Sequence, residues 1–199
     1  GIPIAVNAGD YLLGEGYRLI AQSAFSAETR ARLLAMAAGA HRTLSIGQGE
    51  ELDAARQLAP PAIARMLDIF RMKTSPAFAV ALKFGAVAAG ADDALCAALD
   101  GFSDALGIAY QIRDDLADAH GGTEAHPLPP LSLLTSLAWE SGDTHARAAA
   151  FAPDAPAARK AEMLLEHYHN EAVRGLAVFR NAELKQLLRR TLERLLKRE

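Results

Sequence analysis

The residues of this chain best suited to chemistry are acids and an amide near the middle of the sequence. Residues 107–118 read Gly-Ile-Ala-Tyr-Gln-Ile-Arg-Asp-Asp-Leu-Ala-Asp. On a helix that advances about 100° per residue, five of these positions fall within an arc of about 100°. They are Gly107, Gln111, Asp114, Asp115 and Asp118. Ile108, Ile112 and Leu116 are apolar, so the segment predicts a helix that packs through one side and presents acids on the other.

Acids at this spacing call for a positive partner. Like charges three or four residues apart on a helix repel one another, and a bound cation would offset that repulsion. Mg²⁺ prefers oxygen ligands and commonly takes one or two carboxylates together with substrate phosphates and water. A diphosphate bridged by Mg²⁺ is therefore the ligand these acids favour. The same acids also fit an ordinary solvated helix end, and the segment alone does not decide between the two interpretations.

A second candidate site precedes Pro76. The run Thr74-Ser75-Pro76 predicts that one helix stops and another starts, with a hydroxyl at the N-cap and proline just inside. Lys73 and Thr74 would then form a local anion site, because the free amides and the dipole of a helix N-terminus favour negative charge. The alternative is a simple N-cap beside a surface lysine.

Helices must position these residues. Ala, the best intrinsic helix former, supplies 43 of the 199 residues, and alternating runs of β-branched and aromatic residues are nearly absent. We expect an all-α fold in which residues 1–199 form a single domain. Apolar positions recur at helical spacing and predict helices over 4–22, 26–58, 60–72, 76–89, 92–119, 131–139, 157–178 and 182–197. Gly90 is expected to end a helix, and loops are expected over 120–130 and 151–156.

Charge and composition exclude several classes of protein. The net charge of −3 leaves no whole-chain electrostatic footprint for nucleic acid. Positive charge gathers only in 180–199, with seven basic and three acidic residues. The longest apolar stretch, 77–91, is shorter than the ~20 residues of a membrane span, so no transmembrane segment is expected. The single Cys96 indicates a reducing compartment, and we expect a cytoplasmic protein.

In order along the chain, these segments resemble the trans-isoprenyl diphosphate synthases, or polyprenyl synthetases. Residues 107–118 resemble the second aspartate-rich motif of that family, with Tyr110 where Phe is usual, and 73–74 match its Lys-Thr pair. Residues 46–53 resemble its Gly-Gln segment, and 9–10 its Gly-Asp pair. The resemblance spans essentially the whole chain and implies an isoprenoid-synthase-type helical bundle.

The resemblance also implies an activity. The protein would be a prenyltransferase that condenses isopentenyl diphosphate with an allylic diphosphate to give a linear trans-isoprenyl diphosphate. Lys73 would bind the leaving diphosphate, while Thr74 and Gln111 would line the reacting end of the pocket and stabilise the allylic cation. Mg²⁺ and the lysine would stabilise charge on the departing group. The implied Mg²⁺ ligands, of which the first also serves substrate binding, are Asp114, Asp115 and Asp118.

Two departures from the family pattern keep alternatives open. The first aspartate-rich motif of the family precedes the part that matches here, so we expect the bundle to be N-terminally incomplete by roughly a third. The loop 120–130 contains neither Lys nor Arg, and Glu124 is its acid. A non-catalytic subunit of a heteromeric synthase is therefore an alternative. A class I terpene cyclase is a weaker one, because the second metal motif of cyclases usually has an Asn/Asp, Ser/Thr, Glu pattern.

The same resemblance implies an assembly. Members of the family typically form homodimers, and the Ala-rich, apolar helix after Ile4 lies in a region suited to contribute to such an interface.

Overall fold

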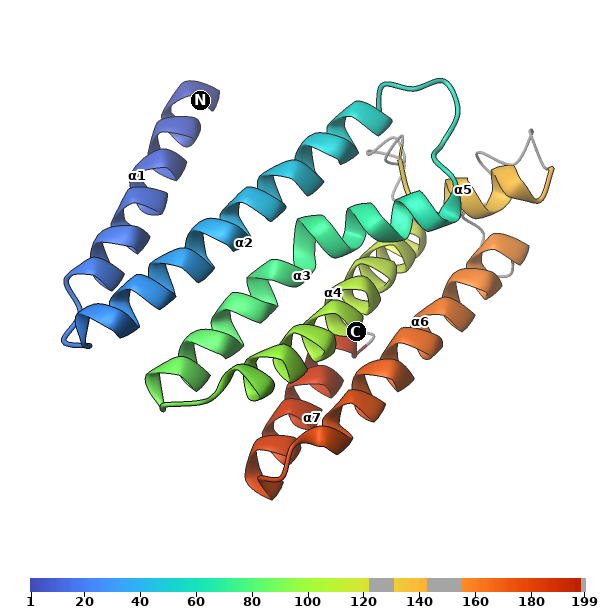
Figure 1. Ribbon diagram of the computed structural model, residues 1–199. Coiled ribbons are helices and arrows are strands. Elements are labelled where there is room, and N and C mark those ends of the chain that lie inside the picture. Colours follow the sequence, from blue (N-terminus) through green and yellow to red (C-terminus); the bar gives the residue numbers. More distant parts are fainter. Residues whose placement is uncertain (122–130, 143–154, 198–199) are drawn as a thin grey trace.

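The computed structural model describes residues 1–121, 131–142 and 155–197, and in these ranges the chain is helical and contains no strand (Figure 1). The elements are α1 (Ile2–Ala21), α2 (Ala27–Ala54), α3 (Ile63–Ala88), α4 (Asp93–Gly121), α5 (Leu133–Glu140), α6 (Pro156–Gly175), the 3₁₀ turn η2 (Leu176–Val178) and α7 (Ala182–Leu196). The all-α expectation is confirmed. Most of the loops expected over 120–130 and 151–156 lie outside the described residues.

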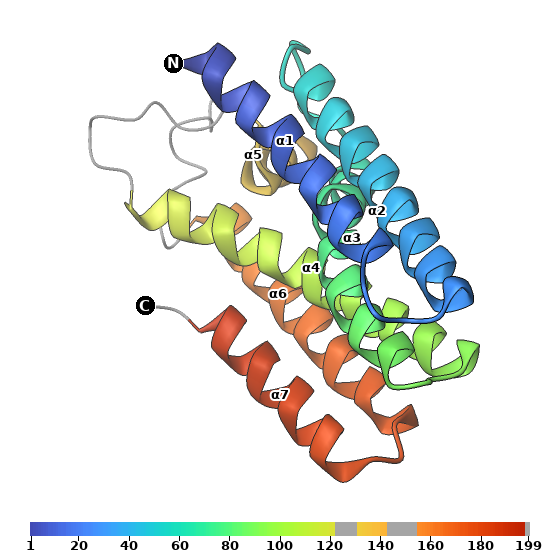
Figure 2. The same cartoon turned by 90° about the vertical axis from the view of Figure 1, so that its left-hand side faces the viewer.

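The helices follow one another across the molecule in chain order. Helix α2 packs on α3, α3 on α4, and α4 on α6, as Figures 1 and 2 show. Helix α7 lies beside α4 and α6, and the short α5 packs across one end of α3, α4 and α6. Helix α4 is therefore central, with its acidic C-terminal half between α3, α5 and α7.

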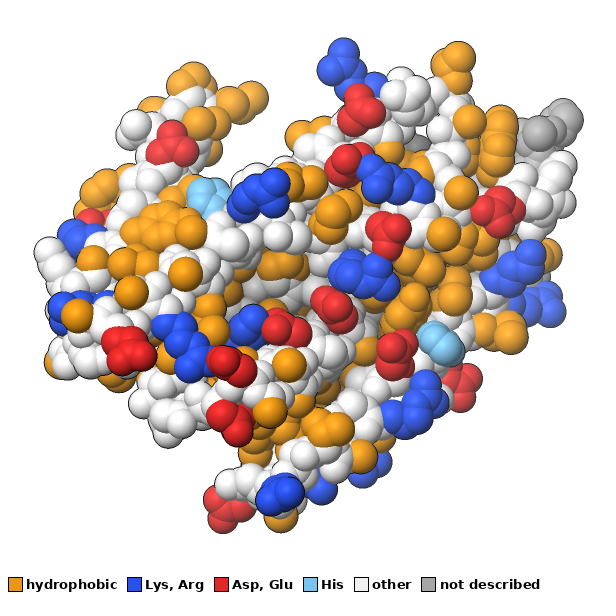
Figure 3. Space-filling view, viewed as in Figure 1, with side chains coloured by type: hydrophobic (Ala, Val, Ile, Leu, Met, Phe, Trp, Pro, Cys, Tyr) orange, Lys and Arg blue, Asp and Glu red, His pale blue; other side chains and the backbone are white. Residues whose placement is uncertain are grey.

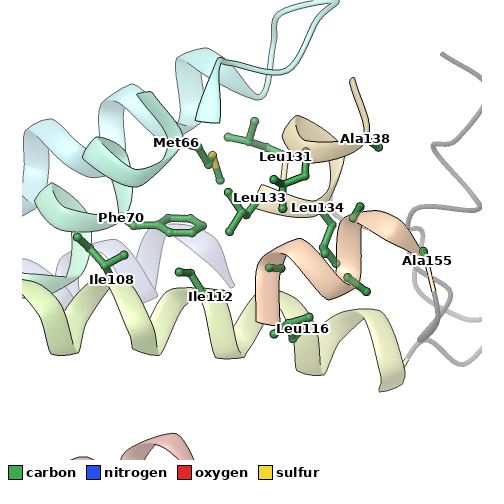
Figure 4. Close-up of a cluster of buried hydrophobic side chains, with 14 residues drawn as sticks. Met66, Phe70, Ile108, Ile112, Leu116, Leu131, Leu133, Leu134, Ala138 and Ala155 are labelled. Carbon is green, nitrogen blue, oxygen red and sulfur yellow. The ribbon is translucent and has the colours of Figure 1, made fainter. Parts of the chain in front are cut away.

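Two hydrophobic cores fix α4 in this place. The first joins α3, α4, α5 and α6, and Phe70, Ile112 and Leu134 are fully buried in it (Figure 4). The second joins α4, α6, η2 and α7 through residues that include Leu106 and Leu188. Burying a side chain of this size contributes about 1.5–3 kcal/mol, so the apolar side of α4 predicted from the sequence anchors the helix.

Local capping explains where several helices begin and end. The Ser26 hydroxyl accepts a hydrogen bond from the Thr29 backbone N–H at 3.1 Å at the start of α2. Ser132 and Thr135 form a capping box on α5, and Asn181 caps α7 by accepting from Leu184 N–H at 2.9 Å. After α3, Gly90 adopts a φ of 79°, a conformation that favours glycine.

The break expected at Thr74-Ser75-Pro76 does not exist. Helix α3 runs without interruption from Ile63 to Ala88 with Pro76 inside it, and Figure 1 shows α3 bending about halfway along. Proline has no backbone N–H and its ring crowds the preceding turn, which kinks a helix without having to end it. The helix expected over 26–58 also ends earlier, at Ala54, and Pro60 and Pro61 precede α3 instead of opening it.

Helix α1 is the most exposed element of the described chain. None of its residues is buried, and it packs mainly on α2. Figure 3 shows hydrophobic side chains along its visible face, and its large exposed ones include Ile4, Leu12 and Leu19. In the ranges that the structure describes, no helix is both long and apolar enough to cross a membrane.

Candidate functional site

Two glycines bring the helix backbones together around the kink of α3. A methyl group on Gly47 of α2 would lie 2.5 Å from the Met72 carbonyl carbon, and one on Gly107 of α4 would lie 2.7 Å from Ser75 Cα. Both contacts are with backbone, which cannot move aside cheaply. Helix α3 is therefore held from both sides along residues 72–75, the stretch that carries Lys73 and Thr74.

The Lys73 ammonium forms an ion pair with Glu51 of α2. Both side chains are largely buried, at 14% and 23% exposure. Gln48 donates a hydrogen bond to the other carboxylate oxygen of Glu51 at 2.9 Å, and the ammonium lies 5.3 Å from the centre of the Phe70 ring. Sequence reasoning did not select Glu51 as a site residue. Gln48 and Glu51 are three residues apart, about one helical turn, and follow the small Gly47. This spacing was the feature of the sequence that could have indicated Glu51.

Asp115 does not lie free on the helix surface. It is half-buried, and its carboxylate accepts a hydrogen bond from the Leu133 backbone N–H, at the start of α5, at 2.6 Å. Burial raises the pKa of Asp115 to about 7, an effect that the Leu133 hydrogen bond and the charge of Lys73 oppose. Asp115 therefore differs from a fully solvated acid, because its carboxylate also contacts the start of α5.

Charged groups on three helices affect the pKa of Asp115. The charges of Asp118 and Glu51 add to the rise in the Asp115 pKa, and that of Lys73 lowers it. Residues of α2, α3 and α4, far apart in the sequence, therefore act on one carboxylate. Because α3 packs on α4, Lys73 lies within electrostatic reach of the acidic end of α4.

Asp114 is held by its neighbour on α4. Arg113 donates to Asp114 Oδ1 through Nη2 and also through Nε, at 3.2 Å for the latter. The guanidinium carbon lies 4.5 Å from the centre of the Tyr110 ring, and Nη1 donates to the Leu195 carbonyl oxygen at the end of α7. Arg113 was not selected from the sequence, because a basic residue between a hydrophobic stripe and an acidic stripe carries no signal of its own.

The other predicted residues occupy the same region. Asp118 is exposed near the end of α4, while Thr74 and Gln111 are half-buried on α3 and α4. The five-residue stripe does lie on one continuous helix. Its two adjacent acids have different partners, however, because Asp114 pairs with Arg113 and Asp115 accepts from α5.

The described residues form no ready-made metal cage: among them no three His, Cys, Asp or Glu side chains lie close enough together to hold an ion. The donor set nevertheless suits Mg²⁺, which binds oxygen and usually keeps several water ligands. The acids are arranged around two ion pairs, Lys73 with Glu51 and Arg113 with Asp114, and the charges of Glu51 and Asp118 act on Asp115. The chemistry of the site thus fits a divalent cation that binds together with a diphosphate.

The fold is that of the isoprenoid synthases. The chain matches the structure of geranylgeranyl pyrophosphate synthetase from the archaeon Geoglobus acetivorans with a TM-score of 0.84 at 23% identity, over 100% of this chain and 67% of that one. The sequence profile described as Polyprenyl synthetase matches residues 1–127. The chain therefore belongs to the polyprenyl synthetase family, which confirms the resemblance seen in its motifs.

Two curated relatives match more than half of the chain. Farnesyl diphosphate synthase of Bacillus subtilis (strain 168) is 32% identical over 127 residues, which is 62% of this chain and 43% of that protein. Geranylgeranyl diphosphate synthase of Sulfolobus acidocaldarius is 28% identical over 117 residues, 58% of this chain and 36% of that protein. The match thus spans less than half the length of these relatives.

Proposed function

We propose that the intact protein is a Mg²⁺-dependent trans-prenyltransferase that condenses isopentenyl diphosphate with an allylic diphosphate to give a linear isoprenyl diphosphate. The observation that carries this proposal is the packing of α3 on α4, which brings Lys73 within electrostatic reach of Asp115, in a chain of the polyprenyl synthetase family. An ammonium beside several carboxylates suits a substrate that is anionic and binds with a metal.

Lys73 would bind the diphosphate. Its ammonium is paired with Glu51, and diphosphate oxygens entering the site would compete with that carboxylate for the same charge. Gln48 also donates a hydrogen bond to Glu51, so the carboxylate that pairs with Lys73 is itself held in position. The leaving diphosphate would then carry its developing charge next to a fixed cation.

Thr74 and Gln111 would line the reacting end of the pocket. Both are half-buried, and α3 and α4 approach closely at Ser75 and Gly107. Ser75 follows Thr74 directly, and Gly107 lies about one helical turn before Gln111. A hydroxyl oxygen and a carboxamide oxygen present partial negative charge to an allylic cation without attacking it as a strong nucleophile would. Because α3 and α4 pack closely together, the side-chain dipoles of Thr74 and Gln111 would stay fixed while positive charge develops on the allylic group.

Asp114, Asp115 and Asp118 would hold the Mg²⁺. When bound, Mg²⁺ supplies positive charge that stabilises the departing diphosphate. The three carboxylates differ in their surroundings. Asp118 is exposed, Asp114 is oriented by Arg113, and Asp115 is bound to α5.

The test is turnover by the intact natural protein with radiolabelled isopentenyl diphosphate, an allylic diphosphate and Mg²⁺. We expect label to pass into a product that an organic solvent extracts and that still carries diphosphate. Chelation of Mg²⁺ should abolish the transfer. Absence of transfer with allylic substrates of every tested chain length would contradict the proposal.

A non-catalytic subunit of a heteromeric synthase is the second candidate. Two observations favour it: the bond of Asp115 to α5 and the absence of a three-residue metal group in the described ranges. The turnover assay separates the two functions, because a subunit would be silent alone and would alter the rate or product length of an active synthase added to it.

We further propose that the protein forms a cytoplasmic homodimer in which α1 contributes to the contact. Leu12 and Leu19 are 67% and 63% exposed on this helix, and burying such side chains is favourable. Leu12→Glu should lower the mass measured by light scattering to that of a monomer, whereas Leu187→Glu on α7 serves as the control, since Leu187 is also exposed. A dimer that survives Leu12→Glu and Leu19→Glu together would exclude α1. The single cysteine, Cys96, is free, which is consistent with the reducing conditions of the cytoplasm.

A further inference from the structure

Arg113 makes three different contacts at once. It donates to Asp114 Oδ1, donates to the Leu195 carbonyl and stacks on Tyr110. The Tyr110 ring in turn packs edge-on against Phe78 of α3, with 5.7 Å between the ring centres. One guanidinium thus connects a candidate metal ligand on α4 with the end of α7. The aromatic ring on which it stacks is supported by α3.

Arg113 contacts the Asp114 carboxylate through one of its two oxygens. Both Nη2 and Nε donate to Oδ1, and within residues 1–121, 131–142 and 155–197 no hydrogen-bond donor reaches Oδ2. A carboxylate fixed through one oxygen keeps a defined orientation for a ligand at the other. Partners that orient a metal-binding carboxylate in this way commonly change metal affinity by 10–100-fold when removed.

The contact to α7 satisfies a group that a helix leaves free. The last four carbonyls of an α-helix have no partner within the helix, and Leu195 lies in the last turn of α7. Positive charge is favoured there by the helix dipole. Burial opposes the charge of Arg113, but its hydrogen bonds to Asp114 and the charge of that carboxylate raise the pKa of Arg113 above its ordinary value.

Only an arginine can make this set of contacts. Its planar fork donates in several directions while its face stacks on an aromatic ring, whereas a lysine ammonium is a single point charge on a flexible stem. Lysine at position 113 would keep the charge near Asp114 but could not bridge Asp114 and Leu195 with the same geometry.

We propose that Arg113 is a positioning residue that orients the Asp114 carboxylate and ties the C-terminal end of α7 to it, so that cation binding at Asp114 and docking of α7 are coupled. That the cation is Mg²⁺ rests on the proposed function. The tie between α4 and α7 does not depend on it. Loss of the tie should therefore be measurable without turnover.

The first measurement is amide hydrogen exchange of the intact protein without metal. In Arg113→Lys, amides in the last turn of α7 should exchange about tenfold faster, because one charge-assisted hydrogen bond that holds this end is lost. The matched control is Arg71→Lys. Arg71 is also paired with an acid on its own helix, Asp68 at 2.6 Å, but lies on α3. Unchanged exchange in α7 of Arg113→Lys would overturn the proposal.

The second measurement tests the coupling. MgCl₂ with inorganic pyrophosphate should slow α7 exchange in the parent and in Arg71→Lys but not in Arg113→Lys. In the turnover assay, Arg113→Lys should raise the Mg²⁺ concentration for half-maximal rate at least tenfold and change kcat at saturating Mg²⁺ by less than threefold. Equal protection of α7 in all three proteins would overturn the coupling. An inactive parent would contradict the proposed function and leave the exchange result standing.

Discussion

Replacing Asp115 by two different residues separates its structural role from its chemical role. Asp115→Ala removes the acceptor of the Leu133 N–H, a hydrogen bond of 2.6 Å at the first turn of α5. Asp115→Asn keeps an oxygen of nearly the same position and removes the charge. Burial disfavours the charged form of this carboxyl, which is why its pKa is raised to about 7, so both variants lose that unfavourable term.

The difference between the two variants therefore isolates the hydrogen bond. Such a bond at a helix N-terminus contributes about 1 kcal/mol, with a range of roughly 0.5–2. For a chain of this length about 1 kcal/mol corresponds to roughly 2–4 °C in Tm. We expect Asp115→Asn to melt at or above the temperature of the parent, and Asp115→Ala about 2–4 °C below Asp115→Asn.

Calorimetry and the isopentenyl transfer assay measure the two roles. Both variants should lose turnover, because neither offers a carboxylate to Mg²⁺. Asp118→Ala is the control for stability, since Asp118 is exposed and its loss should leave Tm unchanged. Equal Tm values for the Ala and Asn variants would refute the bond to α5. Full turnover by Asp115→Asn would refute the role of the carboxylate as a ligand.

Other positions give sharp stability predictions. Gly107→Ala should lower the free energy of unfolding by about 1–3 kcal/mol, because its methyl group would overlap the Ser75 backbone. Gly101→Ala on the same helix meets nothing within 4 Å and should raise it by up to about 1 kcal/mol. Urea denaturation compares the two, and a stable Gly107→Ala would contradict the close approach of α3 and α4. Leu134→Ala, at a position with no exposure, should cost about 2–5 kcal/mol, and a loss below about 1 kcal/mol would contradict the core around α5.

Features that depend on neighbouring residues could be predicted from the sequence. Ser26 caps a helix and Gly90 follows the end of one, because capping and positive φ are local properties. The apolar stripe of residues 108, 112 and 116 is buried as its period predicts. The helix break predicted at Pro76 was wrong. Proline weakens a helix locally, but whether the helix ends there depends on contacts with the rest of the fold. The contacts of 72–75 with Gly47 and Gly107 hold α3 together there.

Pairings across the fold could not be predicted in the same way. The sequence places Lys73 and three acids in candidate roles, but their partners Glu51, Arg113 and the N-terminus of α5 come from other segments or other faces. Whether a carboxylate is exposed, paired or buried depends on these tertiary contacts. The pKa of Asp115 is the clearest example, since its main cause is burial by packed helices.

We propose that Lys73 binds a diphosphate near the acidic end of α4, and a second lysine on α3 offers a matched control. Lys83 lies on the same helix, is 18% exposed, and pairs with Asp100 at 2.8 Å, much as Lys73 pairs with Glu51. In the intact protein, Lys73→Gln should lower kcat/KM for isopentenyl transfer at least 100-fold, while Lys83→Gln stays within threefold of the parent. Equal rates for the two variants would contradict the claim.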